Sequence, residues 1–218
     1  FLAAQRLARR LSERERALVG AIGPALTVPP DFHSAASALR AALDRYPDDT
    51  RLRLALVAML LRVGALRDAE LESRKEVEKA PLAEAYLGLA LSSKDSDDEA
   101  RAVFGSCLSR SPGASLCSSA LAYLDLNEGR CAEASRTVRR EVSLFPNSPA
   151  AHRRLAVAMA AEGAPPESVF TLLTKANQFG GDAVTSPSPH QVLSVQIQRL
   201  LFEGRLTEAG HFRDQLRQ

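Results

Sequence analysis

A glycine followed five residues later by a small residue recurs along this chain, and this motif constrains the fold more than any other feature. The pairs are Gly64 and Ala69, Gly129 and Ala134, Gly163 and Ser168, and Gly204 and Ala209. Gly129 and Gly163 are 34 residues apart, and so are Pro112 and Pro146. A sequence period of roughly 20–50 residues is typical of stacked copies of one supersecondary unit.

A proline lies twelve residues after the small residue of several copies. These pairs are Ala35 and Pro47, Ala69 and Pro81, Ala100 and Pro112, and Ala134 and Pro146. Glycine favours the left-handed backbone at which a helix ends, and a small residue lets two antiparallel helices approach closely. Proline lacks the N–H that would continue a second helix. The spacing therefore predicts helical hairpins, which bury their apolar faces only when they stack.

The whole set of spacings resembles the tetratricopeptide repeat (TPR) family, whose period is 34. The best copy runs from Ala83-Glu84-Ala85-Tyr86 through Glu99-Ala100 to Ser111-Pro112, and the resemblance covers about residue 31 to the end. It implies an all-α fold, a right-handed superhelical solenoid without β-sheet. One copy departs from the period, because Pro81 and Pro112 are only 31 residues apart. We expect that shortening in the turn at 92–95.

The organisation expected along the chain begins with N-terminal helices over 1–30, where Ser12-Glu13-Arg14-Glu15 is a capping box that opens a helix. The repeat array then spans 31–218, and the segment 180–189 is a Gly/Ser/Pro loop. Hairpins are expected at about 50–82, 83–114, 115–148, 149–180 and 190–218. Because the chain opens on Phe1 rather than Met, we expect it to be part of a longer protein.

Composition argues against several kinds of partner. Lys and Arg number 28 against 26 Asp and Glu, a net charge of +2, whereas nucleic-acid-binding proteins usually carry a larger basic excess on one face. No apolar stretch approaches the ~20 residues of a membrane span, and no signal peptide is visible. We expect no nucleic-acid partner, no membrane span in this chain and a cytoplasmic location.

Residue patterns that carry chemistry are mostly missing from the sequence. There is no Gly-rich phosphate loop, and the four histidines fall in different parts of the chain, without metal-ligand spacing. We therefore expect no catalytic residues, no metal, no cofactor and no enzymatic activity. Cys107, Cys117 and Cys131 are spaced by 10 and 14 residues. The favoured interpretation is small residues packed between helices, and the alternative is a Cys107–Cys117 disulfide across a turn.

The TPR resemblance implies that the first helices of successive hairpins line a concave groove. The candidate peptide-binding residues on these helices are Arg51, Leu54, Ala58, Ser119, Tyr123, Arg153 and Val157. This mixture is apolar with a few cations, and arginine binds carboxylates through paired hydrogen bonds. It suits a peptide that carries an acidic group. The alternative is a groove that contacts only solvent or domains of the same protein outside this chain.

The function expected from the resemblance is a non-catalytic scaffold that binds a protein or peptide in the groove. The alternative is a regulatory or sensory module of a larger bacterial signalling protein, such as a serine/threonine kinase or a transcriptional regulator. That alternative rests on a short likeness over residues 11–19 and the hairpin that ends at Tyr46-Pro47. Arginines crowd the first two helices, either as solvated faces or as a contact with a preceding domain or an acidic partner.

Overall fold

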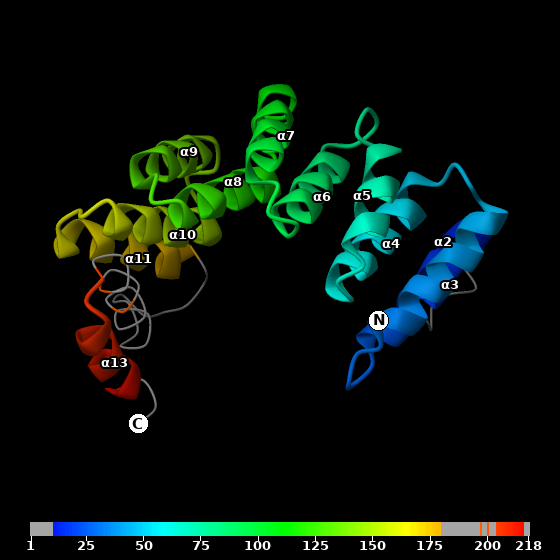
Figure 1. Ribbon diagram of the computed structural model, residues 1–218, viewed down its shortest axis with the longest axis horizontal. Coiled ribbons are helices and arrows are strands. Elements are labelled where there is room, and N and C mark those ends of the chain that lie inside the picture. The colour runs from blue at the N-terminus through cyan, green and yellow to red at the C-terminus, as the bar shows by residue number, and fades with distance from the viewer. Residues whose placement is uncertain (1–10, 180–196, 198–199, 201–203, 216–218) are drawn as a thin grey trace. The chain divides into compact units, whose positions relative to one another are not determined.

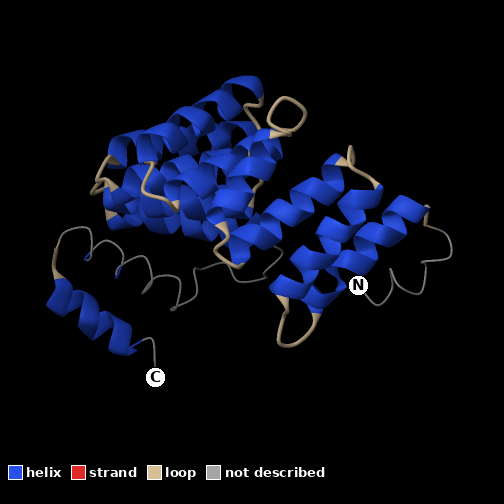
Figure 2. Ribbon diagram, turned by 45° about the vertical axis from the view of Figure 1, so that its right-hand side comes forward, coloured by secondary structure: helices blue, strands red, loops and turns tan. Residues whose placement is uncertain are grey.

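The computed structural model describes residues 11–179, 197, 200 and 204–215, and in these residues it contains helices and no strand (Figures 1 and 2). The all-α class is therefore confirmed. The expected helix over 1–10 and the Gly/Ser/Pro loop lie outside the described residues. The elements are α2 (Glu13–Ile22), η2 (Gly23–Leu26), α3 (Phe32–Arg45), α4 (Thr50–Arg62), α5 (Leu66–Arg74), α6 (Pro81–Ser92), α7 (Asp97–Arg110), α8 (Ser115–Asn127), α9 (Cys131–Leu144), α10 (Pro149–Ala161), α11 (Pro166–Phe179) and α13 (Leu206–Gln215).

The chain forms two compact units, unit 1 (Phe1–Cys117) and unit 2 (Ser118–Gln218). In unit 1, each helix from α2 to α7 packs against the next one along the chain. In unit 2, α10 packs against both α9 and α11. This pairing of consecutive helices is the arrangement expected of stacked hairpins. The handedness of the superhelix and a division at residue 30 stay predictions.

The glycines of the motif occupy the left-handed backbone that the sequence predicts. Gly64, Gly129, Gly163 and Gly204 have φ angles of 74°, 75°, 86° and 71°. In each case the next residue donates its N–H to the carbonyl five residues earlier, as Ala65 does to Leu60 at 2.9 Å. Asp95, with φ 59°, takes the glycine's place in the remaining copy. Aspartate is one of the few residues with a side chain that adopts this conformation readily.

The repeat copy that is shorter than the 34-residue period has its shortening at a different place from the one expected. Asp95 precedes Ala100 by five residues, so the turn at 92–95 has the regular length and the expectation of a shortening there is wrong. Pro81 does not follow the end of a helix but is the first residue of α6, just as Pro149 is the first residue of α10. Proline suits that position because the first N–H of a helix has no partner within it. The missing residues lie instead in α5, which has 9 residues against 14 in α7.

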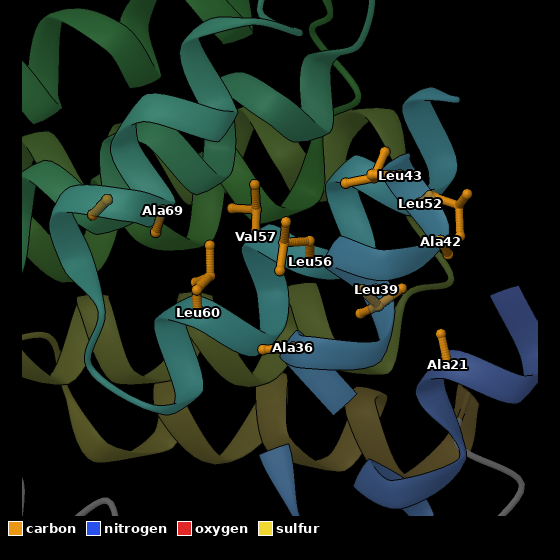
Figure 3. Packing of buried hydrophobic residues seen from close by; sticks show 11 residues of the cluster. Ala21, Ala36, Leu39, Ala42, Leu43, Leu52, Leu56, Val57, Leu60 and Ala69 are labelled. Carbon is orange, nitrogen blue, oxygen red and sulfur yellow. The ribbon is translucent and has the colours of Figure 1, made fainter. Parts of the chain in front are cut away.

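Buried alanine and leucine side chains form the core between the helices. The small residues Ala35, Ala69, Ala100 and Ala134 are all fully buried. In unit 1 one cluster combines residues of five consecutive helices, α2 to α6, and Figure 3 shows ten of its members by name. At about 25 cal/mol per Å² of apolar surface removed from water, this burial is the main term that stabilises stacked hairpins.

A buried ion-pair network accompanies the early end of α5. Glu76 is 1% exposed and accepts hydrogen bonds from Arg53 Nε at 2.9 Å and Thr50 Oγ1 at 2.7 Å. Burial by itself would raise the pKa of Glu76, but hydrogen bonds from Thr50, Lys79 and Arg53 outweigh it and lower that pKa. The network keeps the chain that follows α5 attached to α4 without a further helical turn.

Cys107 and Cys117 are joined by a disulfide, with their Cα atoms 6.4 Å apart. The favoured interpretation of these two residues as unbonded packing residues is therefore wrong, and the alternative is confirmed. Cys131, by contrast, is free and partly buried. The ten-residue separation fits both interpretations, because α7 ends and α8 begins between the two cysteines.

Gly88 is predicted to tolerate no side chain. A Cβ added there would lie 2.3 Å from Cε1 of Phe104, a ring that is itself buried. We expect Gly88→Ala to destabilise the fold by about 1–3 kcal/mol through overpacking. Gly105→Ala is the matched control, because a Cβ there meets nothing within 4 Å and should stabilise α7 by about 0.5–1 kcal/mol. Urea unfolding of both variants tests this, and a Gly88→Ala protein as stable as wild type would contradict it.

Ala134 and Ala132 provide a second comparison. Ala134 is fully buried at the hairpin contact, whereas Ala132 is exposed. We therefore expect Ala134→Trp to cost roughly 1–3 kcal/mol or more and Ala132→Trp to cost little. Equal denaturation midpoints for the two variants would show that the small residue of the motif does not set the distance between the helices.

Candidate functional site

A pocket of about 330 Å³ lies in unit 2, between residues of α8, α9 and α10. Its lining is mostly apolar. Four of the seven predicted site residues meet there: Ser119 and Tyr123 from α8, and Arg153 and Val157 from α10. The remaining lining residues are Ala122, Leu126, Val138, Arg154 and Ala158.

Helical spacing explains why these side chains share one face. Ser119 and Tyr123 are four residues apart, as are Arg153 and Val157, so each pair lies on one side of its helix. The sides that face the core carry buried residues instead, such as Leu124 in α8 and Ala156 in α10. Tyr123 remains 67% exposed although it is a large aromatic residue. A ligand that covers its ring would remove this apolar surface from water.

Two adjacent arginines of α10 have different environments. Arg154 donates from Nε to Glu141 Oε2 at 3.2 Å and also bonds the other carboxylate oxygen through Nη2. Glu141 is 3% exposed and accepts a further bond from Ser118 Oγ at 3.0 Å. Arg153 is exposed and has no hydrogen bond or ion pair with any residue that the structure describes. Its guanidinium is therefore available to a ligand.

The charge of the pocket is positive. Its lining contains two arginines and no carboxylate, and the charge of Arg154 is balanced by Glu141 behind it. One uncompensated guanidinium therefore stands beside an apolar surface. Such a site attracts an anionic group, and a carboxylate can form two parallel hydrogen bonds with arginine.

The other three predicted residues lie on α4 in unit 1 and do not line this pocket. Arg51 is exposed, and its Nε lies 3.8 Å from Asp49 Oδ1. Leu54 and Ala58 are partly buried on the same side of the helix. Sequence reasoning also missed Val138 of α9, which forms part of the pocket. Its position four residues after Ala134 was the available signal, because it places Val138 on the side of α9 that faces α8 and α10.

The described part of the chain contains neither a candidate metal cluster nor a candidate membrane-spanning helix. No group of three or more His, Cys, Asp and Glu residues there could hold a metal ion. His152 is buried, with Nε2 2.7 Å from the carbonyl of Pro146 and its ring stacked on Phe179. Within the same residues, no helix has the length and apolar character needed to span a membrane.

Comparison with known proteins shows which solved structures share this fold. No protein-family model and no curated protein sequence matches the chain. Among solved structures, PilW, a widely conserved type IV pilus biogenesis factor, has a TM-score of 0.67 at 14% identity over 94% of this chain and 93% of its own. A thermophilic TPR protein of Thermus thermophilus has 0.64 at 14% identity, over 87% and 98%. MamA of Desulfovibrio magneticus RS-1 has 0.53 at 16%, over 78% and 93%.

These similarities concern the fold alone, because the sequence identities are only 14–16%. They cover most of each chain, and one of the proteins is a TPR protein by description. Together with the consecutive packing of helices and the glycine turns, they confirm the resemblance to the tetratricopeptide family at the level of the fold.

The adjacent arginines are predicted to differ in their contribution to stability. Arg154→Ala would leave Glu141 buried without its guanidinium, so we expect a loss of about 1–3 kcal/mol. Arg153→Ala removes an exposed side chain and should change stability by less than about 0.5 kcal/mol. Chemical denaturation of the two variants measures the difference. An equal effect of both substitutions would show that the Glu141 ion pair is dispensable.

Proposed function

We propose that the chain is a non-catalytic scaffold that binds a protein or peptide partner through the pocket between α8 and α10. The observation that carries this proposal is the exposed ring of Tyr123 beside the unpaired guanidinium of Arg153, above an apolar base. Exposed aromatic and arginine side chains contribute more than other residues to protein interfaces. The all-helical repeat fold gives such a surface rigid support.

The partner that suits this pocket is a segment with an apolar side chain next to an acidic group. The apolar side chain would contact Tyr123, Leu126 and Val157, and its carboxylate would meet Arg153. A pocket of about 330 Å³ accommodates one or two side chains rather than a folded domain. The face of α4 that carries Arg51, Leu54 and Ala58 in unit 1 is proposed as a second, separate contact surface.

The alternative is that this repeat region is a regulatory or sensory module of a larger bacterial signalling protein. In that case the partner would be another domain of the same protein. Both alternatives use the same pocket, and neither needs a catalytic residue or a cofactor. The expected cytoplasmic location also stays a prediction. The Cys107–Cys117 disulfide argues against it, because disulfides are rare in the reducing cytoplasm.

Binding is predicted to depend on Tyr123 and Arg153. A suitable probe is a peptide selected from a random 12-residue display library for binding to the chain, and we expect the selected peptides to be acidic. Fluorescence anisotropy measures the affinity of such a peptide. Tyr123→Ala with Arg153→Ala should weaken it by about tenfold or more per anchor, that is ~1–2 kcal/mol each. Thermal stability should remain nearly unchanged, because both side chains are exposed.

The matched control is Arg140→Ala with Leu144→Ala, which removes an exposed arginine and an exposed apolar residue from α9 outside the pocket. This control should bind the peptide like wild type. If the pocket variant binds with wild-type affinity, the interface lies on another surface. If the peptides selected carry no acidic residue, the scaffold function stands and the acidic preference is wrong.

A further inference from the structure

Cys107 lies at a position of its hairpin that a buried glutamate occupies in two other hairpins. Cys107 lies seven residues after Ala100, the small residue of its hairpin. The corresponding residues are Glu76, in the turn that follows α5, and Glu141 of α9, which lie seven residues after Ala69 and Ala134. All three are buried. In these three hairpins a buried side chain at this place connects the second helix, or the turn that follows it, to another helix.

The connections at this place differ in kind. Glu76 is held by a hydroxyl and a guanidinium, from Thr50 and Arg53. Glu141 is also held by a hydroxyl and a guanidinium, but Ser118 belongs to α8 in its own hairpin whereas Arg154 belongs to α10 in the next one. A buried carboxylate needs such partners, because burying an unpaired charge is costly.

Cys107 has no charged partner. The polar contact of its Sγ is the carbonyl oxygen of Pro81 at 3.7 Å, and its covalent partner is Cys117, in the first turn of α8. The residue that corresponds to Cys117 in α4 is Leu52, a buried core residue. At the α7–α8 junction a covalent bond therefore does what the Glu141–Arg154 ion pair does at the α9–α10 junction.

Burial protects this bond from reduction. Both cysteines are 0% exposed, and a reducing thiolate must reach one of the sulfur atoms directly. A dithiol would attack that sulfur, break the S–S bond and form a mixed disulfide. The second thiol of the reductant would then displace the remaining cysteine and close the reductant's own disulfide. Cys107 and Cys117 thereby gain two electrons and two protons and become thiols. This reaction requires the junction to open locally first.

We propose that the Cys107–Cys117 disulfide is a permanent staple of the α7–α8 junction, formed as the chain folds in a compartment that keeps disulfides oxidised. Structural disulfides form and persist in such compartments and are rare in the reducing cytoplasm. The chain then functions outside the cytoplasm, in contrast to the location expected from its sequence. Cys131 is the remaining thiol of the chain and takes no part in the staple.

The first test measures how much the fold depends on the bond. Closing a loop of about ten residues should raise the thermal midpoint by about 5–10 °C for a chain of this size, so reduction with a phosphine should lower it by that amount. Cys107→Ala with Cys117→Ala should unfold at a midpoint that the phosphine does not change. Cys131→Ser should respond to the phosphine as wild type does. Equal midpoints for oxidised and reduced wild type would overturn the staple.

The second test asks where the bond exists in the cell. Source cells are quenched in acid, free thiols are blocked with a maleimide, and the remaining cysteines are reduced and labelled with a second reagent. Mass spectrometry of the peptides should find Cys131 with the first label and Cys107 and Cys117 with the second. The first label on all three cysteines would show a reduced junction and overturn the proposed compartment.

Discussion

The close contact between the two helices of each hairpin is the constraint on which the rest of the structure depends. Ala69, Ala100 and Ala134 have no exposed surface, and any larger side chain would push the helices apart. The left-handed residue five positions earlier sets where the first helix stops and how the second one returns. This pair of requirements recurs with the period of the fold. The exposed faces of the helices are thereby left free to vary, and the pocket lies on such a face.

Polar and covalent bonds supplement this apolar packing at one recurring place. The buried carboxylates of Glu76 and Glu141 are paired with arginines, and Cys107 is bonded to Cys117. Apolar contacts between helices are not directional, whereas hydrogen-bonded ion pairs and disulfides fix particular atoms to each other. These bonds therefore specify the register between helices more than they add to the burial that drives folding.

Much of the fold was predictable from the sequence, because the glycine, alanine and proline spacings report backbone conformation and close contact directly. Pro81 was misassigned because proline is favoured both after a helix and at the first residue of the next one, and spacing does not distinguish the two. Four pocket residues were predicted from their places on the first helices. The different environments of Arg153 and Arg154 were not predictable, because neighbouring helix positions diverge by about 100° and only the location of Glu141 decides which arginine forms the ion pair.

The division of tasks between these two arginines has a consequence for how the chain can change. Arg154 is bound to a buried carboxylate, while Arg153 forms no hydrogen bond or ion pair with any described residue. Most proteins stand only slightly above the stability they need, so substitutions that alter recognition are commonly limited by their cost in stability. Here position 153 is released from that limit. Under the proposed function, a change of charge at position 153 would alter the choice of partner without requiring a compensating change in the scaffold.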